Sequence, residues 1–115
     1  MPHLTLTQSK NITHDAKSFF IHAHQLLTDR LPTQMKSCQS RVVLADDYLV
    51  ADGSSADGFA YLEIAILAGR SSILLKEISK EIYQLLEEHL LAQSVLTQIK
   101  ISVEIRNLNE VYYSK

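Results

Sequence analysis

The chain passes twice through the same order of elements: an apolar-alternating strand, an amphipathic helix and a second strand. Polar and apolar residues alternate over 3–7, which is the pattern of a half-buried strand. A helical pattern follows, with Thr13 as its expected N-cap, and ends before Pro32 because the residue before a proline avoids the α region. The stretch 41–45 reads as the second strand, and 48–51 is expected to continue it or pair beside it.

The second half has stronger signals for the same three elements. It predicts a strand over 59–67, a helix over 72–93 and a strand over 99–106, with Asp52-Gly53 and Asp57-Gly58 marking turns between the halves. Two strand–helix–strand units that share one sheet, with both helices on one face, make an α+β fold. Strands joined through a helix are expected to run parallel with a right-handed crossover.

The length of 115 residues fits one domain over 1–115, with repeat-like halves over about 1–51 and 59–106. The hydrophobic share of 46% and the charged share of 21% are those of an ordinary globular protein. No segment remains to form a third layer over the second face of the sheet. If that face is apolar, a symmetric closed oligomer is the economical way to cover it.

Charge and composition exclude several classes of protein. The formal net charge of −2, without a basic stripe, predicts no nucleic-acid partner. No apolar run is long enough to span a membrane, and residues 1–20 lack the apolar core of a signal peptide. Cys38 is the only cysteine, so the chain has no internal disulfide. These features predict a cytoplasmic protein without a membrane partner.

Pro2 is a candidate proton carrier. A small second residue normally allows removal of Met1, which would leave Pro2 with a free secondary amine. An α-amino group titrates at roughly 7.7–8.0, near the pH at which a general base works best. Pro2 shares the parity of Leu4 and Leu6, so its ring is expected on the apolar side of the first strand.

Arginines at strand ends are candidates for binding a carboxylate. Arg70, between Gly69 and Ser71, lies where a strand ends and a helix begins, a position suited to anions. Gln39 and Arg41, two residues apart in extended chain, are expected on one face. An exposed arginine without a role is the simpler reading of each position.

The other reactive side chains carry weaker signals. The five histidines show no metal-ligand spacing, so no metal site is expected and solvated or helix-edge histidines are the simpler reading. Lys36 and Arg41 near Cys38 could lower the pKa of its thiol, although a lone loop cysteine is usually incidental.

The combination of these motifs resembles the 5-carboxymethyl-2-hydroxymuconate delta-isomerases of the tautomerase superfamily, in order and spacing over essentially the whole chain. The matching segments are Met1-Pro2-His3, Ser40-Arg41-Val42, Ala51-Asp52-Gly53, Gly69-Arg70-Ser71 and Ile101-Ser102-Val103-Glu104-Ile105.

The resemblance implies a homotrimeric, cofactor-independent isomerase that ketonises a carboxylated dienol to a keto acid in the breakdown of aromatic compounds. Pro2 matches the family's proton-shuttling proline and Arg70 matches its arginine after the third strand. A second functional arginine of the family aligns with Gln39, which cannot supply positive charge, and Arg41 could substitute for it. Gln39 in place of an arginine therefore puts the identity of the substrate in question more than the type of reaction.

Two other functions remain open on the sequence. One is a non-catalytic protein that binds small molecules on the same scaffold. The glutamine at position 39, where the family has a functional arginine in the resemblance, suggests this function. The other is a ferredoxin-like regulatory or oligomerisation domain, because the order of elements also permits it.

Overall fold

The computed structural model describes residues 2–53, 58–94, 98–109 and 111–114. Within these ranges the chain forms a four-stranded sheet and two long helices. The elements in chain order are β1 (His3–Ser9), α1 (Ala16–Arg30), the short 3-10 helix η1 (Met35–Ser37), β2 (Gln39–Ala45), β3 (Gly58–Leu67), α2 (Ser72–Gln93) and β4 (Ile99–Leu108).

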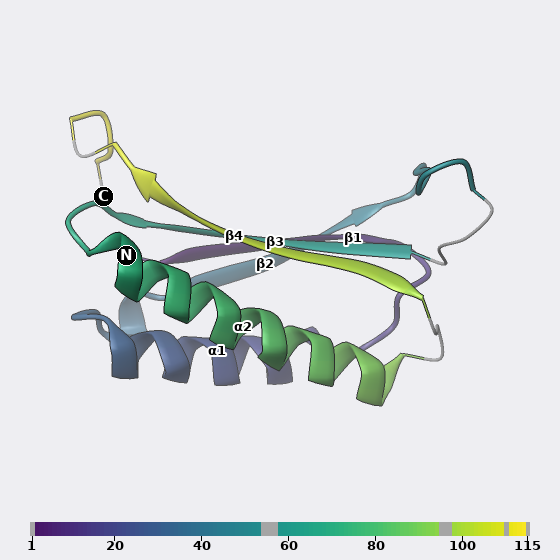
Figure 1. The fold of residues 1–115 in the computed structure, drawn as a ribbon, viewed down its shortest axis with the longest axis horizontal. Coiled ribbons are helices and arrows are strands. Elements are labelled where there is room, and N and C mark those ends of the chain that lie inside the picture. The colour runs from purple at the N-terminus through teal and green to yellow at the C-terminus, as the bar shows by residue number, and fades with distance from the viewer. Residues whose placement is uncertain (1, 54–57, 95–97, 110, 115) are drawn as a thin grey trace.

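The strands lie in the order β2-β1-β3-β4. The pairs β1–β2 and β3–β4, each joined through a helix, are parallel, whereas the central pair β1–β3 is antiparallel. Both helices lie on the same face of the sheet, side by side (Figure 1). The predicted α+β arrangement of two strand–helix–strand units is therefore confirmed.

The core lies between the helices and the two central strands. Leu4 and Leu6 of β1 and Leu62 and Ile64 of β3 are fully buried, because alternate residues of a strand point to the same face. The helices contribute apolar stripes at three- and four-residue spacing, as expected for helices that cover a sheet. The buried helix residues are Phe19, Phe20, Ala23, Leu27, Ile78, Ile82, Leu86 and Leu90.

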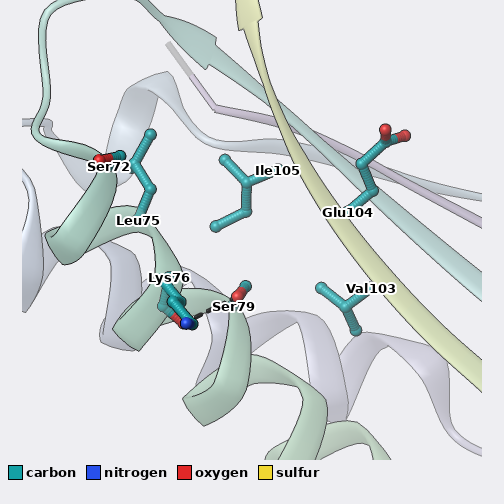
Figure 2. A pocket seen from close by; sticks show the side chains of 7 residues that line it. All are labelled: Ser72, Leu75, Lys76, Ser79, Val103, Glu104 and Ile105. Carbon is teal, nitrogen blue, oxygen red and sulfur yellow. Dashed lines mark hydrogen bonds between the residues drawn. The ribbon is translucent and has the colours of Figure 1, made fainter.

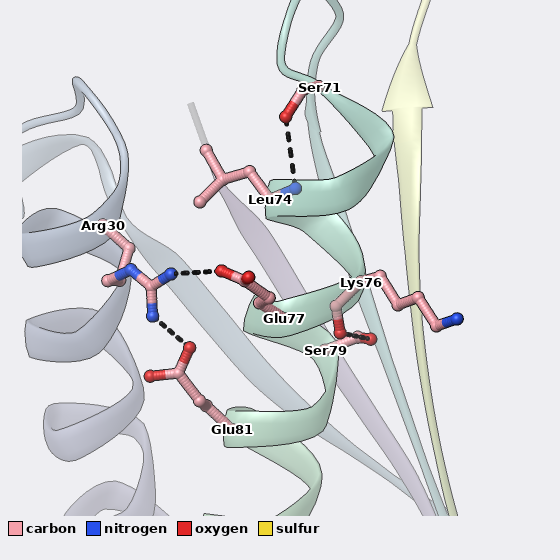
Figure 3. A network of polar contacts seen from close by, with 7 residues as sticks. All are labelled: Arg30, Ser71, Leu74, Lys76, Glu77, Ser79 and Glu81. Atoms are coloured by element: carbon pink, nitrogen blue, oxygen red, sulfur yellow. Dashed lines mark hydrogen bonds and ion pairs between the residues drawn. The ribbon is translucent and has the colours of Figure 1, made fainter.

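Polar contacts join the two helices outside the core. The guanidinium of Arg30, in the last turn of α1, donates to Glu81 and, at 3.0 Å, to Glu77 of α2 (Figure 3).

The hydroxyl of Ser71 caps α2 by accepting from the backbone N–H of Leu74 at 3.2 Å. Because Ser71 ends the turn after β3, the cap holds the start of α2 at that edge of the sheet.

Helix α1 begins later than its pattern predicts. Its N-cap is Asp15, whose carboxylate accepts from the N–H of Ser18, and not Thr13. The reason lies in β1: the side chain of Gln8 donates to the carbonyl of Ile12 at 2.8 Å. This bond holds the chain before Asp15 against the strand.

The turn predictions are confirmed in part. The stretch 48–51 is not a strand, because Ala51 has a φ of 52° and Gly53 a φ of 88°, and the N–H of Gly53 closes a turn onto Val50. The predicted turn at Asp57-Gly58 falls partly outside the described residues, since Asp57 is not among them and Gly58 opens β3.

The sheet face away from the helices, here called the open face, is largely polar. Its polar members include Thr5, Thr7, Tyr61, Glu63, Ser102, Glu104 and Arg106. Glu63 forms an ion pair with Arg106 at 3.2 Å, and the Tyr61 hydroxyl donates a hydrogen bond to Glu104. Within the sheet, the exposed large apolar side chains lie on the edge strand β2, where Val42, Val43 and Leu44 are 37%, 46% and 54% exposed.

Candidate active site

The start of β1, the start of β2 and the end of β3 lie together at one end of the sheet, here called the Pro2 edge. His3, the first residue of β1, pairs with Gln39 at the start of β2 and with Ala65 near the end of β3. The carbonyl of Pro2 accepts a hydrogen bond from the N–H of Gln39 at 3.1 Å. The register therefore brings Pro2, the start of β2 and the turn after β3 to the same edge.

The ring of Pro2 faces the helices. It is less than 2% exposed and belongs to the same side of β1 as the buried Leu4 and Leu6, as its parity predicts. The first position of a strand suits a proline, since no ladder donor is lost from a strand interior. Met1, on whose removal a free Pro2 amine depends, lies outside the described residues.

The turn after β3 holds Arg70. Gly69 has a φ of 116°, a conformation that a residue with a Cβ rarely adopts. This turn directs the Arg70 guanidinium back onto the end of β3, where one terminal nitrogen donates to the carbonyl of Leu67 at 2.9 Å. The side chain is therefore tethered to the Pro2 edge by its own turn.

One nitrogen of the Arg70 side chain lacks an acceptor. Its Nε is buried and has no hydrogen-bond partner among the residues that the structure describes. An unsatisfied buried donor costs about 1–3 kcal/mol, more when it is charged. An anion that reached this nitrogen would remove that cost, and a guanidinium can hold a carboxylate with two parallel bonds.

Gln39 and Arg41 lie on the open face, opposite to the ring of Pro2. Gln39 pairs with His3 and Arg41 with Thr5, and a terminal nitrogen of Arg41 donates to the Thr5 hydroxyl at 3.1 Å. The two residues share a face, as their spacing predicts. Within one chain, the structure thus places Arg70 at the Pro2 edge and directs Arg41 to the other side of the sheet.

The C-terminal segment also reaches the Pro2 edge, which sequence reasoning missed. A ring nitrogen of His3 lies 2.7 Å from the hydroxyl of Tyr113, and the two rings meet edge to face. The two residues are 110 positions apart, so no local pattern could show this contact.

A second missed contact lies on the helix side of β2. The Nε2 of His24 in α1 lies 2.5 Å from the hydroxyl of Ser40, which pairs with Leu4. Burial lowers the pKa of His24, and burial together with the guanidinium of Arg41 lowers that of His3. Both shifts favour the neutral imidazole, and both side chains are partly buried and hydrogen-bonded.

Cys38 does not have the reactive thiol that its neighbours suggest. Burial raises the pKa of this thiol, contrary to the lowering expected from Lys36 and Arg41. The thiol contacts the carbonyl of Gln34 at 3.7 Å. A protonated thiol is a poor nucleophile.

Two grooves lie where the helices leave the edge strands uncovered. One, of about 360 Å³, runs between α2 and β4; Leu75, Val103 and Ile105 point into it, whereas Glu104 points away (Figure 2). The other, of about 350 Å³, lies beside β2 and is lined by residues such as Val42 and Leu44. Pro2 and Arg70 line neither groove.

The residues that the structure describes include no group of three or more histidine, cysteine or carboxylate side chains able to hold a metal ion. None of the described helices is long and apolar enough to cross a bilayer.

Comparison with known proteins gives the family. The family model of 5-carboxymethyl-2-hydroxymuconate isomerase matches residues 2–115. A 5-carboxymethyl-2-hydroxymuconate isomerase from Deinococcus radiodurans R1 has a similar structure, with a TM-score of 0.86 and 27% identity over 99% of this chain and 87% of that one. No curated protein sequence matched the chain.

Two further structures extend the likeness. A 5-carboxymethyl-2-hydroxymuconate delta-isomerase aligns with a TM-score of 0.80 and 26% identity over 100% of this chain and 87% of that one. A structure described as a fused 4-OT wild-type symmetric trimer shares the fold, with a TM-score of 0.71 and 15% identity over 96% of this chain and 91% of that one. The chain therefore belongs to the 5-carboxymethyl-2-hydroxymuconate isomerase family of the tautomerase superfamily.

Proposed function

We propose that the chain is a cofactor-independent isomerase that ketonises a carboxylated dienol such as 5-carboxymethyl-2-hydroxymuconate. Pro2 carries the proton and Arg70 binds a substrate carboxylate. Membership of the isomerase family supports the reaction class. The roles of Pro2 and Arg70 are supported by one observation: the buried Pro2 shares the Pro2 edge with Arg70, whose buried Nε has no acceptor among the described residues.

The reaction needs one group that both accepts and donates a proton. The Pro2 amine takes the proton from the dienol hydroxyl, and the oxygen becomes a carbonyl as electrons move along the conjugated system. The same proton is then delivered to a carbon further along, so one O–H bond breaks and one C–H bond forms without net oxidation or reduction. Burial of the Pro2 ring favours the neutral amine, which is the form that can accept a proton.

Arg70 supplies charge where the substrate carries it. Its guanidinium is tethered through the Leu67 carbonyl, which leaves the buried Nε for a carboxylate oxygen. A hydrogen bond to a charged group contributes about 1.5–3 kcal/mol. Such a contact fixes the dienol relative to the Pro2 amine and stabilises negative charge as it develops.

Arg41 and Gln39 can join such a site only through a second protomer. Both lie on the open face, away from the ring of Pro2 in their own chain. The proposed assembly is a homotrimer, supported by the exposed apolar run of β2 and by the trimer in the description of one structural relative. In that assembly Arg41 replaces the charge that the family carries at position 39.

The test combines intact mass with an ultraviolet assay of 2-hydroxymuconate ketonisation. Protein that lacks Met1 is expected to turn over the dienol, and protein that retains Met1 is not, because Pro2 is then an amide. Pro2→Ala replaces the secondary amine by a primary one, so a substantial loss of kcat is expected. Arg70→Ala is expected to lower kcat/KM by about tenfold to a hundredfold, from the lost charged contact.

Lys10→Ala is the matched control for the charge change. Lys10 is an exposed cation paired with Asp46 just beyond the far end of β1, so its loss is expected to leave turnover unchanged. Parent rates in both Pro2→Ala and Arg70→Ala would contradict the proposed mechanism.

The alternative function is a non-catalytic binding protein on the same scaffold. The glutamine at position 39, which cannot supply charge, favours it. Tight binding of an unsaturated diacid by Met1-free protein, measured by calorimetry and without any turnover, would select this alternative over the isomerase.

A further inference from the structure

A histidine pair lies beyond the far end of β1, well away from the Pro2 edge. His14, in the connection between β1 and α1, places its Nδ1 3.0 Å from the Nε2 of His89 in α2. Its other nitrogen, Nε2, lies 2.8 Å from the side-chain oxygen of Gln8 in β1. One half-buried imidazole thus links a strand, a connection and the opposite helix.

The partners of Gln8 determine where the protons sit. The amide nitrogen of Gln8 donates to the carbonyl of Ile12 at 2.8 Å, so its oxygen must face His14. An amide oxygen only accepts, so the Nε2 of His14 carries a hydrogen. In a neutral imidazole the other nitrogen then has a lone pair. The Nδ1 of His14 is therefore the acceptor, and the Nε2–H of His89 is the donor.

We infer that the His14–His89 pair is an acid-sensitive latch between the β1–α1 connection and the C-terminal half of α2. A first proton on His89 leaves its Nε2–H donating to His14, so the hydrogen bond survives and becomes charge-assisted. A second proton, on His14, turns the acceptor into a donor and sets two cations against each other at 3.0 Å. The latch therefore holds with no or one added proton and opens with two.

Helix ends favour this order of protonation. His14 comes directly before Asp15, the N-cap of α1, where the helix dipole disfavours positive charge. His89 lies near the C-terminal end of α2, where the dipole favours it. The backbone N–H of Asp15 also donates to the side chain of Gln93 at 2.8 Å, so a second contact ties the same two helix ends.

Several neighbouring groups shift the pKa values of the two histidines, some upward and some downward. Burial, the largest influence, lowers the pKa of both histidines. A hydrogen bond with the backbone of Asp15 raises the pKa of His89, and the carboxylate of Asp15 acts to raise the pKa of both. His22 of α1 adds to the lowering at His89, and His89 adds to it at His14. Lys10 lines the groove beside His14, and the ring of Phe19 packs on His89 with centroids 5.7 Å apart.

The sign of the effect on stability follows from these directions. Because both pKa values are lower in the folded chain than the ordinary 6.5, the unfolded chain binds more protons on acidification. The stabilisation is present above about pH 6.5 and is lost as pH falls through the lowered folded values. Each unit of lowering makes unfolding about tenfold more favourable at the acid end, for each histidine.

The latch is tested by nitrogen NMR of the imidazole rings and by thermal unfolding from pH 8 to pH 5. The NMR of the parent is expected to show His14 with hydrogen on Nε2 and with a pKa below the ordinary 6.5. Acidification is expected to lower the Tm of the parent. His14→Gln, which cannot take up the second proton, is expected to lose clearly less.

Two results would overturn the inference. One is a His14 ring that carries its hydrogen on Nδ1 or whose pKa is not below the ordinary 6.5. The other is a parallel loss of Tm in the parent and in His14→Gln. The NMR arm uses the unaltered chain, so the inference can be tested even where the variant fails to fold.

Discussion

Position 39 is where the side chain departs from the pattern of the family that the chain resembles, while the backbone keeps the strand pairing. Gln39 binds the Pro2 carbonyl through its backbone N–H, so its place at the Pro2 edge depends on the strand pairing and not on its side chain. The side chain is free to vary, and it is exposed on the open face together with that of Arg41. A change of substrate can therefore be accommodated here without a change of fold.

Restoring the arginine tests this directly. Gln39→Arg adds a charged donor at the position where the family resemblance implies a functional arginine. Activity on a dicarboxylated dienol is expected to rise by about tenfold in kcat/KM, the free energy of one charge-assisted contact at the low end of its range. Steady-state assays with 5-carboxymethyl-2-hydroxymuconate measure the effect.

The control adds the same charge elsewhere. Gln84→Arg lies on the exposed side of α2 and is expected to leave the rate unchanged. A Gln39→Arg enzyme that matches the parent would show that position 39 does not face the substrate.

Among the elements, the turn between β3 and α2 matters most for the proposed site. Gly69 supplies the positive φ, Arg70 folds back onto Leu67, and Ser71 caps α2. Three consecutive residues thus end a strand, orient a cation and start a helix. The strength of the cap therefore bears on both stability and the placement of Arg70.

Removing the cap has a predictable cost. Ser71→Ala deletes the acceptor for the Leu74 N–H, and a lost N-cap costs about 1 kcal/mol, within a range of about 0.5–2. Urea unfolding followed by circular dichroism measures the change. Ser72→Ala, one residue on and exposed, is the control and is expected to stay within about 0.5 kcal/mol of the parent.

At the scale of the whole molecule, the surfaces differ from the simplest expectation. An apolar second sheet face was the expected reason for oligomerisation, but the open face carries paired charges such as Glu63 with Arg106. Within the sheet, the exposed large apolar side chains lie on the edge strand β2 instead. An exposed edge strand of this kind is a natural place for another chain to bind.

A charge on that strand is expected to break the assembly. Leu44→Lys removes an apolar contact worth about 1.5–3 kcal/mol and places a cation in the interface, so association is expected to weaken more than tenfold. Sedimentation equilibrium distinguishes a trimer of about three times 13.0 kDa from single chains.

The matched variant is Leu91→Lys on α2, where the leucine is 59% exposed, close to the 54% of Leu44. It is expected to sediment like the parent. A parent protein with the mass of one chain would contradict the proposed trimer, whereas dissociation by Leu91→Lys alone would move the interface to α2.

The amino-acid sequence by itself determined the elements, their order and the face to which Pro2 belongs. Strand alternation and helical spacing are short-range properties, so they predicted β3, α2 and the buried sides of β1 with small errors at the ends. The late start of α1 was missed because the bond from Gln8 to Ile12 competes with the helix, and helix propensity does not register such a bond.

Only the tertiary structure decided which side chains meet. The contact of His3 with Tyr113 and that of His14 with His89 join residues 110 and 75 positions apart. Packing and register likewise leave the Nε of Arg70 without a partner among the described residues and put Pro2 and Arg41 on opposite faces of the sheet. Side-chain period tells which face of an element a residue occupies, whereas the partner across the core depends on how distant elements are brought together.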